Sequence, residues 1–254
     1  MMLYCHQTLH MDSGFAVLLA VVGLVAAGIA AVTGFGIGSL MTPTLALATG
    51  TKLAVAAISI PHLVGTGQRF WLLREHVDRQ ILLRFGIASA AGGLVGALSH
   101  VFVSSRALAL VFGVVVALAG GSELTGWMQH VRWGHRSAWI AGVLSGLLGG
   151  IVGNQGGIRT AALLGFHVPK EAFVATSTAI GLFVDGARIP VYLATEWRDI
   201  ARVWPLVLTA TLAVVIGTAL GTRVLGGLPR RLFRRVIAAL LIALGLYMII
   251  AGRG

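Results

Sequence analysis

Charged residues are scarce in this 254-residue chain, where they make up 11% of the sequence, against about a quarter in soluble domains. Hydrophobic residues make up 57%, and the mean hydropathy is +0.92. A soluble fold of this size cannot bury so much apolar surface, so the composition excludes a soluble globular protein. A crossing helix takes about 20 residues, and we expect residues 1–254 to form a single transmembrane domain.

Cysteine and acidic residues are also few. One cysteine, Cys5, excludes an intramolecular disulfide and a cysteine metal site. The sequence contains none of the carboxylate pairs or the HExxH, GxSxG and phosphate-loop motifs that enzymes use, so we predict no enzyme activity, no metal and no cofactor. There are 19 basic residues against 8 acidic ones. Most of these bases lie in short loops, where they indicate orientation beside anionic lipid and not a nucleic-acid partner.

Apolar runs fill most of the chain, and two of them are short. The runs lie at residues 14–33, 38–49, 53–73, 81–103, 107–120, 138–152, 157–166, 172–194, 200–225 and 232–251. Those at 38–49 and 157–166 are about half as long as a crossing helix. Each follows a glycine-rich break, at 34–38 and at 153–157, so we expect a broken helix or a re-entrant pair at both places.

The matching breaks indicate an internal repeat, with repeat 1 at about 14–121 and repeat 2 at about 137–252. A shift of 119 residues makes nine of 47 ungapped pairs identical. The identical pairs are Gly23 and Gly142, Gly34 and Gly153, Gly38 and Gly157, Leu45 and Leu164, Val55 and Val174, Ala56 and Ala175, Leu63 and Leu182, Gly67 and Gly186, and Arg69 and Arg188. The sequence therefore predicts an all-α polytopic membrane protein of two repeats, each with a Gly-broken helix or re-entrant pair followed by three spans.

Three spans after each pair place the second repeat upside down in the membrane relative to the first. The basic residues agree, because they gather on one side. That side has Arg74, Arg79, Arg132, Arg136, Lys170, Arg223, Arg230, Arg231, Arg234 and Arg235, and the other has Lys52, Arg106, Arg198, Arg202 and Arg253. The positive-inside rule assigns the larger group to the cytoplasm and both termini to the outside of the inner (cell) membrane. Inverted repeats with paired broken helices are typical of secondary transporters.

A half-helix that begins inside the bilayer leaves its first N–H groups without helical partners, and these donors favour a negative ligand. The sequence therefore predicts an anion site at the breaks. The candidates that supply backbone, hydroxyls and amides are Thr33, Gly34, Phe35, Gly36, Gly38, Ser59, Asn154, Gln155, Gly156, Gly157, Thr176, Ser177 and Thr178. The alternatives are that the glycines serve only close helix packing and that each hydroxyl bonds to its own helix.

Ionisable residues inside the runs are further candidates, because burying a charge in lipid is costly. Arg159 follows the second break and is expected to bind substrate, since guanidinium recognises oxyanions bidentately. Arg69 lies near the end of its run and is expected to reach the membrane interface. Arg188 is expected to pair with Asp185, one helical turn away. Together with His62, which can carry a proton near neutral pH, Arg69, Asp185 and Arg188 are candidates for a charge or proton relay; the alternative for each is a structural role.

Three stretches resemble the TauE/SafE sulfite exporter family, also called TSUP: residues 28–43 (GIAAVTGFGIGSLMTP), 146–157 (GLLGGIVGNQGG) and 175–178 (ATST). The resemblance implies transport of small sulfur-containing oxyanions such as sulfite, thiosulfate, sulfoacetate and related organosulfonates, usually as export. Two departures concern the substrate. The second break has Asn154 and Gln155 where the family has more glycine, and residues 58–60 (ISI) are a degraded copy of the ATS element.

These inferences predict a membrane transporter that exports a small sulfur-containing oxyanion by alternating access, with lipid as its surroundings. Moving an anion outward across an inside-negative membrane is favourable by about 2.3 kcal/mol per charge per 100 mV. The alternatives are an anion channel and a non-transporting membrane protein, either an assembly factor or an intramembrane enzyme.

Overall fold

The computed structural model describes residues 13–126, 135–153, 156, 159, 163, 169–224 and 230–251, and this part of the chain is helical without strands. Its elements are α1 (Ser13–Thr33), α2 (Ile37–Thr49), α3 (Thr51–Leu73), η1 (Arg74–His76), α4 (Arg79–Ile81), η2 (Leu82–Gly86), α5 (Ile87–Phe102), α6 (Ser105–Thr125), α7 (His135–Val152), α9 (Lys170–Arg202), α10 (Trp204–Val224) and α11 (Arg230–Ala251). Most of the predicted half-helix at 157–166 lies outside the described residues, as do the candidates Asn154, Gln155 and Gly157.

Five helical segments are long and apolar enough to cross a membrane: Ser13–Thr33, Arg79–Phe102, Ser105–Ser122, Glu171–Arg202 and Trp204–Gly221. Large apolar side chains cover the outside of the bundle, including Val17, Leu94 and Leu212, which are 62%, 43% and 56% exposed. A surface of this kind needs lipid and not water around it. The protein is therefore an all-α, multi-pass membrane protein, as the sequence predicts.

Helix α9 extends beyond the apolar run at residues 172–194. It begins at Lys170, continues to Arg202 and spans 33 residues. Its last turns are polar and are held by a pair three residues apart, in which Arg202 Nη1 donates to Asp199 Oδ1 at 2.8 Å. Hydropathy marks the apolar part of a helix and not its end, so the run alone does not locate the end of α9.

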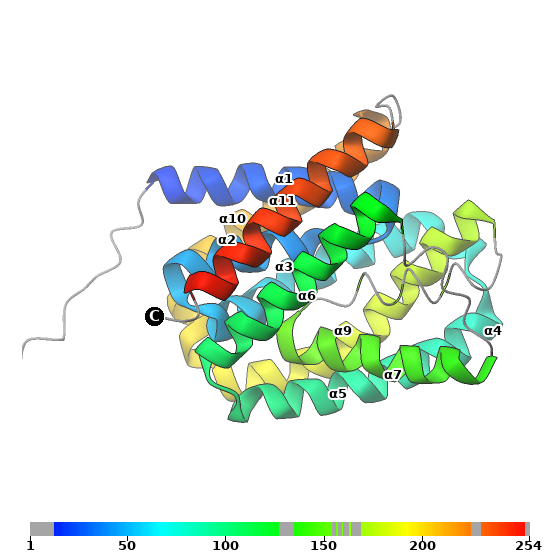
Figure 1. Ribbon diagram of the computed structural model, residues 1–254, viewed down its shortest axis with the longest axis horizontal. Coiled ribbons are helices and arrows are strands. Elements are labelled where there is room, and N and C mark those ends of the chain that lie inside the picture. The colour runs from blue at the N-terminus through cyan, green and yellow to red at the C-terminus, as the bar shows by residue number, and fades with distance from the viewer. Residues whose placement is uncertain are drawn as a thin grey trace, which may run out of the picture.

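The helices pack in pairs that the shift of 119 residues exchanges (Figure 1). Helix α1 lies along α10, and α5 lies along α7, while α6 pairs with α11 and α3 crosses α9. The shift places α1 on α7, α3 on α9, α5 on α10 and α6 on α11. The shift therefore maps the α1–α10 pair onto the α7–α5 pair, and it maps the α6–α11 and α3–α9 pairs onto themselves. Two repeats related by a pseudo-two-fold axis would pack in this way; their inverted orientation in the membrane stays a prediction.

The ends of the helices agree with the predicted grouping of basic residues. Lys52 Nζ donates to the carbonyl of Val101 at 2.8 Å and lies 3.7 Å from a carboxylate oxygen of Glu196. The Lys52 N–H donates to Ser105 Oγ at 3.3 Å. The start of α3, the end of α5, the start of α6 and the last turns of α9 therefore meet on one side of the bundle. The side that faces the cytoplasm stays a prediction.

Glycines bring α5 and α7 into backbone contact. A Cβ on Gly146 would overlap the carbonyl oxygen of Ser89, and one on Gly92 would overlap the carbonyl oxygen of Val143. Such close approach is the usual means by which helices associate in lipid, where neighbouring hydrocarbon removes the hydrophobic driving force.

Replacing Gly146 with alanine is expected to destabilise the protein by about 1–3 kcal/mol, because the methyl group would force the two helices apart. Thermal unfolding in detergent measures the effect. Gly186→Ala in α9 is the matched control: no described atom lies within 4 Å of the place its Cβ would take. Alanine there should leave stability unchanged or raise it by up to about 1 kcal/mol. Equal losses in the two variants would contradict the tight α5–α7 contact.

Candidate functional site

Gly34 and Gly153, the residues with which the two breaks begin, share an unusual backbone conformation. Gly34 and Gly153 both have positive φ, +83° and +74°, a region that side chains rarely adopt and that glycine enters without strain. Gly34 of the first repeat lies against α9 of the second, and Gly153 of the second repeat lies against α3 of the first. A Cβ on Gly34 would meet Val174 of α9 at its Cα, 4.0 Å away, and one on Gly153 would meet Val55 Cγ1 at 3.5 Å. Because Val55 and Val174 are 119 residues apart, the two breaks are equivalent in their contacts as well as in sequence.

The two breaks also touch each other at the centre of the bundle. A Cβ on Gly38, in the first turn of α2, would lie 2.5 Å from the carbonyl oxygen of Gly153, and one on Gly156 would lie 2.5 Å from Phe35 Cβ. The N–H of Leu40 donates to the carbonyl of Gly36, so the N–H groups that precede Leu40 in α2 have no helical acceptor. Phe35, Gly38 and Gly156 therefore lie where the two breaks meet.

Most of the predicted hydroxyl groups are hydrogen-bonded to nearby backbone. Thr33 Oγ1 lies 3.0 Å from the carbonyl oxygen of Ile29 and 2.8 Å from that of Phe35, and its single proton is shared between these two acceptors at the end of α1. Ser59 donates to Ala56, and its repeat partner Thr178 donates to Val174. Thr176 Oγ1 accepts from the N–H of Asp78 at 2.9 Å. In this arrangement Thr33, Ser59 and Thr178 shape the helices and offer no hydroxyl proton to an anion.

Ser177 differs from these hydroxyls. Its side chain is fully buried, and its Oγ has no hydrogen-bond partner within the part of the chain that is described. It points at the first break, since a Cβ on Gly34 would lie 3.4 Å from Ser177 Oγ. A buried hydroxyl that lacks a partner is costly. Ser177 is therefore a free hydrogen-bond donor beside the first break, within the described residues.

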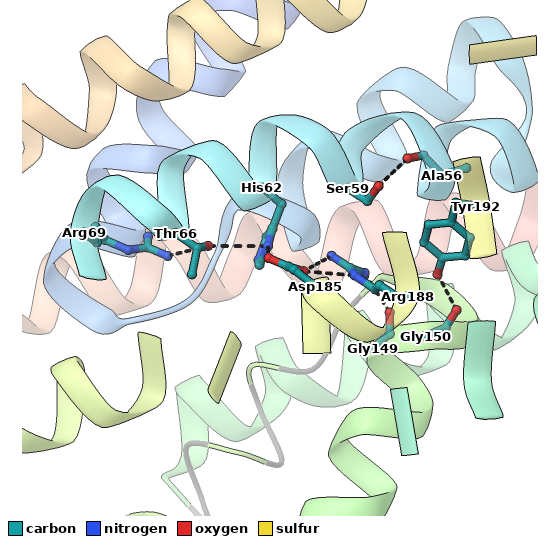
Figure 2. Close-up of polar contacts among 10 residues, drawn as sticks. All are labelled: Ala56, Ser59, His62, Thr66, Arg69, Gly149, Gly150, Asp185, Arg188 and Tyr192. Carbon is teal, nitrogen blue, oxygen red and sulfur yellow. Dashed lines mark hydrogen bonds and ion pairs between the residues drawn. The ribbon is translucent and has the colours of Figure 1, made fainter. Parts of the chain in front are cut away.

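Asp185 is the centre of a buried polar cluster that joins α3 to α9 (Figure 2). Its Oδ2 lies 2.7 Å from His62 Nδ1, and its Oδ1 lies 3.0 Å from Arg188 Nε and 2.8 Å from Arg188 Nη2. The predicted pair of Asp185 with Arg188 is confirmed, and the contact with His62 is an addition that spacing along the sequence does not show. The 2.7 Å contact requires the proton on Nδ1 of His62, which donates it to the carboxylate.

Arg188 also closes the end of α7. Its Nη1 donates to the carbonyl of Gly149 at 2.7 Å, and the hydroxyl of Tyr192 donates to the carbonyl of the next residue, Gly150. A positive charge at a helix C-terminus is favourable because the last carbonyls are unpaired and negative. Arg188 therefore has a complete set of partners, and its position supports a structural role in holding the second break.

Arg69 and Arg159 are buried and incompletely paired. They are 3% and 2% exposed, and Nε and Nη1 of both have no hydrogen-bond partner among the described residues. Arg69 Nη2 donates to Thr66 Oγ1 at 3.2 Å, and Arg159 Nη1 lies beside the same threonine, since a Cβ on Gly181 would be 3.3 Å from both Arg159 Nη1 and Thr66 Cγ2. The expectation that Arg69 reaches the membrane interface is wrong, because its side chain turns back along α3 toward Thr66 and the bundle interior (Figure 2).

Two residues that sequence reasoning missed complete this group. A Cβ on Gly181 of α9 would lie 3.3 Å from Arg159 Nη1 and 3.3 Å from Thr66 Cγ2, so Gly181 leaves the space that the Arg159 guanidinium occupies. Thr66 holds Arg69 and lies 3.4 Å from His62 Nδ1. The first residue of α2 is nearby, because a Cβ on Gly65 would lie 3.1 Å from Ile37 Cδ1. A search for repeat-related positions that differ in charge would have found Thr66, whose counterpart is Asp185.

The arrangement has the chemistry of an oxyanion site. Two forked guanidinium groups suit oxygen atoms in bidentate geometry, and buried positive charges without a carboxylate partner favour a negative ligand. Thr66 Oγ1 lies 3.4 Å from His62 Nδ1, but that nitrogen holds the proton donated to Asp185 and so does not act as a base toward the hydroxyl.

Comparison with known proteins agrees with this chemistry. No curated protein and no solved structure matches the chain. The family described as "Sulfite exporter TauE/SafE" matches residues 19–248, which is nearly the whole chain and includes both breaks and both unpaired arginines. This protein therefore belongs to the TauE/SafE sulfite exporter family of membrane transporters.

Proposed function

We propose that this protein exports a small sulfur-containing oxyanion, and that the anion binds between Arg69 and Arg159 where α3 crosses α9. The observation that carries the proposal is the pair of buried guanidinium groups whose Nε and Nη1 atoms have no partner among the described residues. Their desolvation is costly unless an anion replaces the lost water. The membership of an exporter family supports sulfite or a related compound as the class of substrate.

The surroundings of the arginines support a site that can change its access. Gly34 of the first break lies against Ser177 of α9, one turn before Gly181, and Ile37 at the start of α2 lies against α3 at Gly65. A rearrangement of one repeat against the other would alter these contacts. Ser177 supplies a further buried donor at the first break. We place the anion near these groups, with Asn154, Gln155 and Gly157 as additional candidates from the sequence, and we propose alternating access between the two sides of the membrane.

The test combines binding with flux. Thermal unfolding in detergent is measured against sulfite, thiosulfate, sulfoacetate, acetate and chloride at matched ionic strength, and the stabilising anions are then followed into proteoliposomes. A ligand at 100 times its dissociation constant should stabilise the protein by about 2.7 kcal/mol. Arg69→Gln and Arg159→Gln should each weaken binding by at least about 30-fold, since each leaves the anion with one missing charged partner.

Arg202→Gln is the control, because Arg202 lies in α9 with a side chain 76% exposed and carries the same charge. It should leave binding and flux unchanged. A flux that neither saturates nor supports counterflow would indicate a channel. The absence of both stabilisation and flux for all five anions would contradict the proposal and favour the non-transporting alternative.

A further inference from the structure

The shift of 119 residues relates two clusters of different charge at the crossing of α3 and α9. It pairs three positions of α3 with three of α9: His62 with Gly181, Thr66 with Asp185, and Arg69 with Arg188. In both clusters an arginine contacts the residue three positions before it, since Arg188 binds Asp185 and Arg69 binds Thr66. The two arginines therefore contact equivalent positions, but only one of these positions holds a carboxylate.

The cluster of His62, Asp185 and Arg188 is closed. The carboxylate accepts from His62 on one oxygen and from Arg188 on the other, at 2.7 and 3.0 Å, and the remaining guanidinium contact goes to the carbonyl of Gly149. The positive charge of Arg188 is thus neutralised within the protein, and each nitrogen of its guanidinium group has a partner.

The cluster of Thr66, Arg69, Arg159 and Gly181 is open. Gly181 has no side chain where the other cluster has His62, and the guanidinium of Arg159 takes that place, beside Thr66. Thr66 stands where the other cluster has Asp185 and brings no charge. The hydroxyl of Thr66 accepts from Arg69 at 3.2 Å, and because His62 Nδ1 donates to Asp185, the hydroxyl proton of Thr66 remains available to a ligand.

The charges of the two clusters do not balance. Within the described residues, three buried arginines share one buried carboxylate, so two positive charges have no negative partner. The other acidic side chains described are Glu75, Asp78, Glu171, Glu196 and Asp199, and none of them is buried. Two unmatched charges in a membrane interior are costly, so a ligand that removes both is favoured over one that removes a single charge.

We propose that the anion bound by the open cluster is doubly charged, and that one of its oxygens takes the place beside Thr66 that corresponds to the Asp185 carboxylate. The inference rests on the proposed function and narrows its substrate class to dianions, such as sulfite in its fully deprotonated form, thiosulfate or a carboxylated sulfonate. Singly charged sulfonates would leave one guanidinium uncompensated.

Two probes separate the charge of the anion from its shape. Thiosulfate and methanesulfonate both present a pyramidal SO3 group on a tetrahedral centre, but the first carries two negative charges and the second carries one. Dissociation constants are obtained from thermal unfolding of the purified protein at pH 8 over a concentration series of each, at matched ionic strength. We expect thiosulfate to bind at least about tenfold more tightly than methanesulfonate.

Substitution of Arg159 tests the same match of charges by changing the protein instead of the anion. Arg159→Gln should weaken the binding of thiosulfate by at least about 30-fold and remove the preference for thiosulfate over methanesulfonate. Arg159→Lys keeps the charge and should keep the preference, although it loses the forked geometry and binds both probes more weakly. Arg202→Gln controls for general effects of net charge and of thiosulfate as a stabilising salt.

The outcomes separate this inference from the proposed function. Equal or tighter binding of methanesulfonate by the unaltered protein would overturn the dianion inference and leave anion export standing. A thiosulfate preference that survives in Arg159→Gln and in Arg69→Gln would also overturn it, because the charge match would lie elsewhere. Failure of both probes and of sulfite to bind or to cross the membrane would overturn the proposed function itself.

Discussion

Thr66→Asp is expected to abolish the tight binding of a sulfur oxyanion while stabilising the protein without ligand. The new carboxylate would stand three residues before Arg69, in the relation that Asp185 has to Arg188, where the carboxylate accepts at 3.0 Å. It would neutralise Arg69 from within and repel an incoming dianion. We expect the dissociation constant for thiosulfate to rise at least about 100-fold, which corresponds to about 2.7 kcal/mol. Ligand-dependent thermal unfolding and proteoliposome flux measure the two effects.

Thr66→Asn is the matched control, since asparagine has the shape of aspartate without its charge. Thr66→Asn should weaken anion binding far less than Thr66→Asp does, because its amide can still accept from Arg69 and donate to a ligand. If Thr66→Asp bound thiosulfate as well as the unaltered protein does, the anion could not lie beside Thr66, and the open cluster would have to be structural.

Asp185→Asn is expected to cost about 3–5 kcal/mol of stability, because removal of one partner leaves a buried charge uncompensated. Asp185 is fully buried and holds both Arg188 and His62. Through Arg188 it also fixes the end of α7 and the second break, so the loss should extend to anion binding. Chemical or thermal unfolding in detergent measures the first effect.

Asp199→Asn on the same helix is the control for this substitution. Asp199 also pairs with an arginine three residues later, at 2.8 Å, but both side chains are exposed. An exposed pair contributes about 0–1 kcal/mol, so Asp199→Asn should scarcely change stability. Similar losses in the two variants would show that Asp185 is not held in a low-dielectric interior.

The class of the fold follows from the sequence because the composition alone indicates that the protein is surrounded by lipid. A chain with 57% hydrophobic and 11% charged residues must satisfy its backbone hydrogen bonds within helices or a closed barrel in lipid, and the long unbroken runs favour helices. The breaks were predictable for a similar local reason. Gly34 and Gly153 interrupt apolar runs where positive φ is needed, and the repeat placed them in register. The end of α9 was not predictable from hydropathy, because its last turns are polar.

Parts of the candidate site were also visible in the sequence. The pair of Asp185 with Arg188 is local, since residues three apart share a helix face. Arg159 was a candidate because an arginine inside an apolar run is costly without a role. Arg69 was misjudged because distance from the end of a run does not say which way a side chain turns: snorkelling and burial are equally compatible with its position.

The membrane fold, the two breaks and the supply of buried charges therefore follow from the sequence, since each depends on composition or on neighbours along one helix. Which charges neutralise one another depends on how the helices pack. The crossing of α3 and α9 brings His62 to Asp185 and places Arg159 in the space left by Gly181, contacts that join residues more than 20 positions apart. Whether a buried arginine is structural or open to an anion depends on those partners, because Coulomb energy in a low dielectric falls off with distance in space and takes no account of separation along the chain.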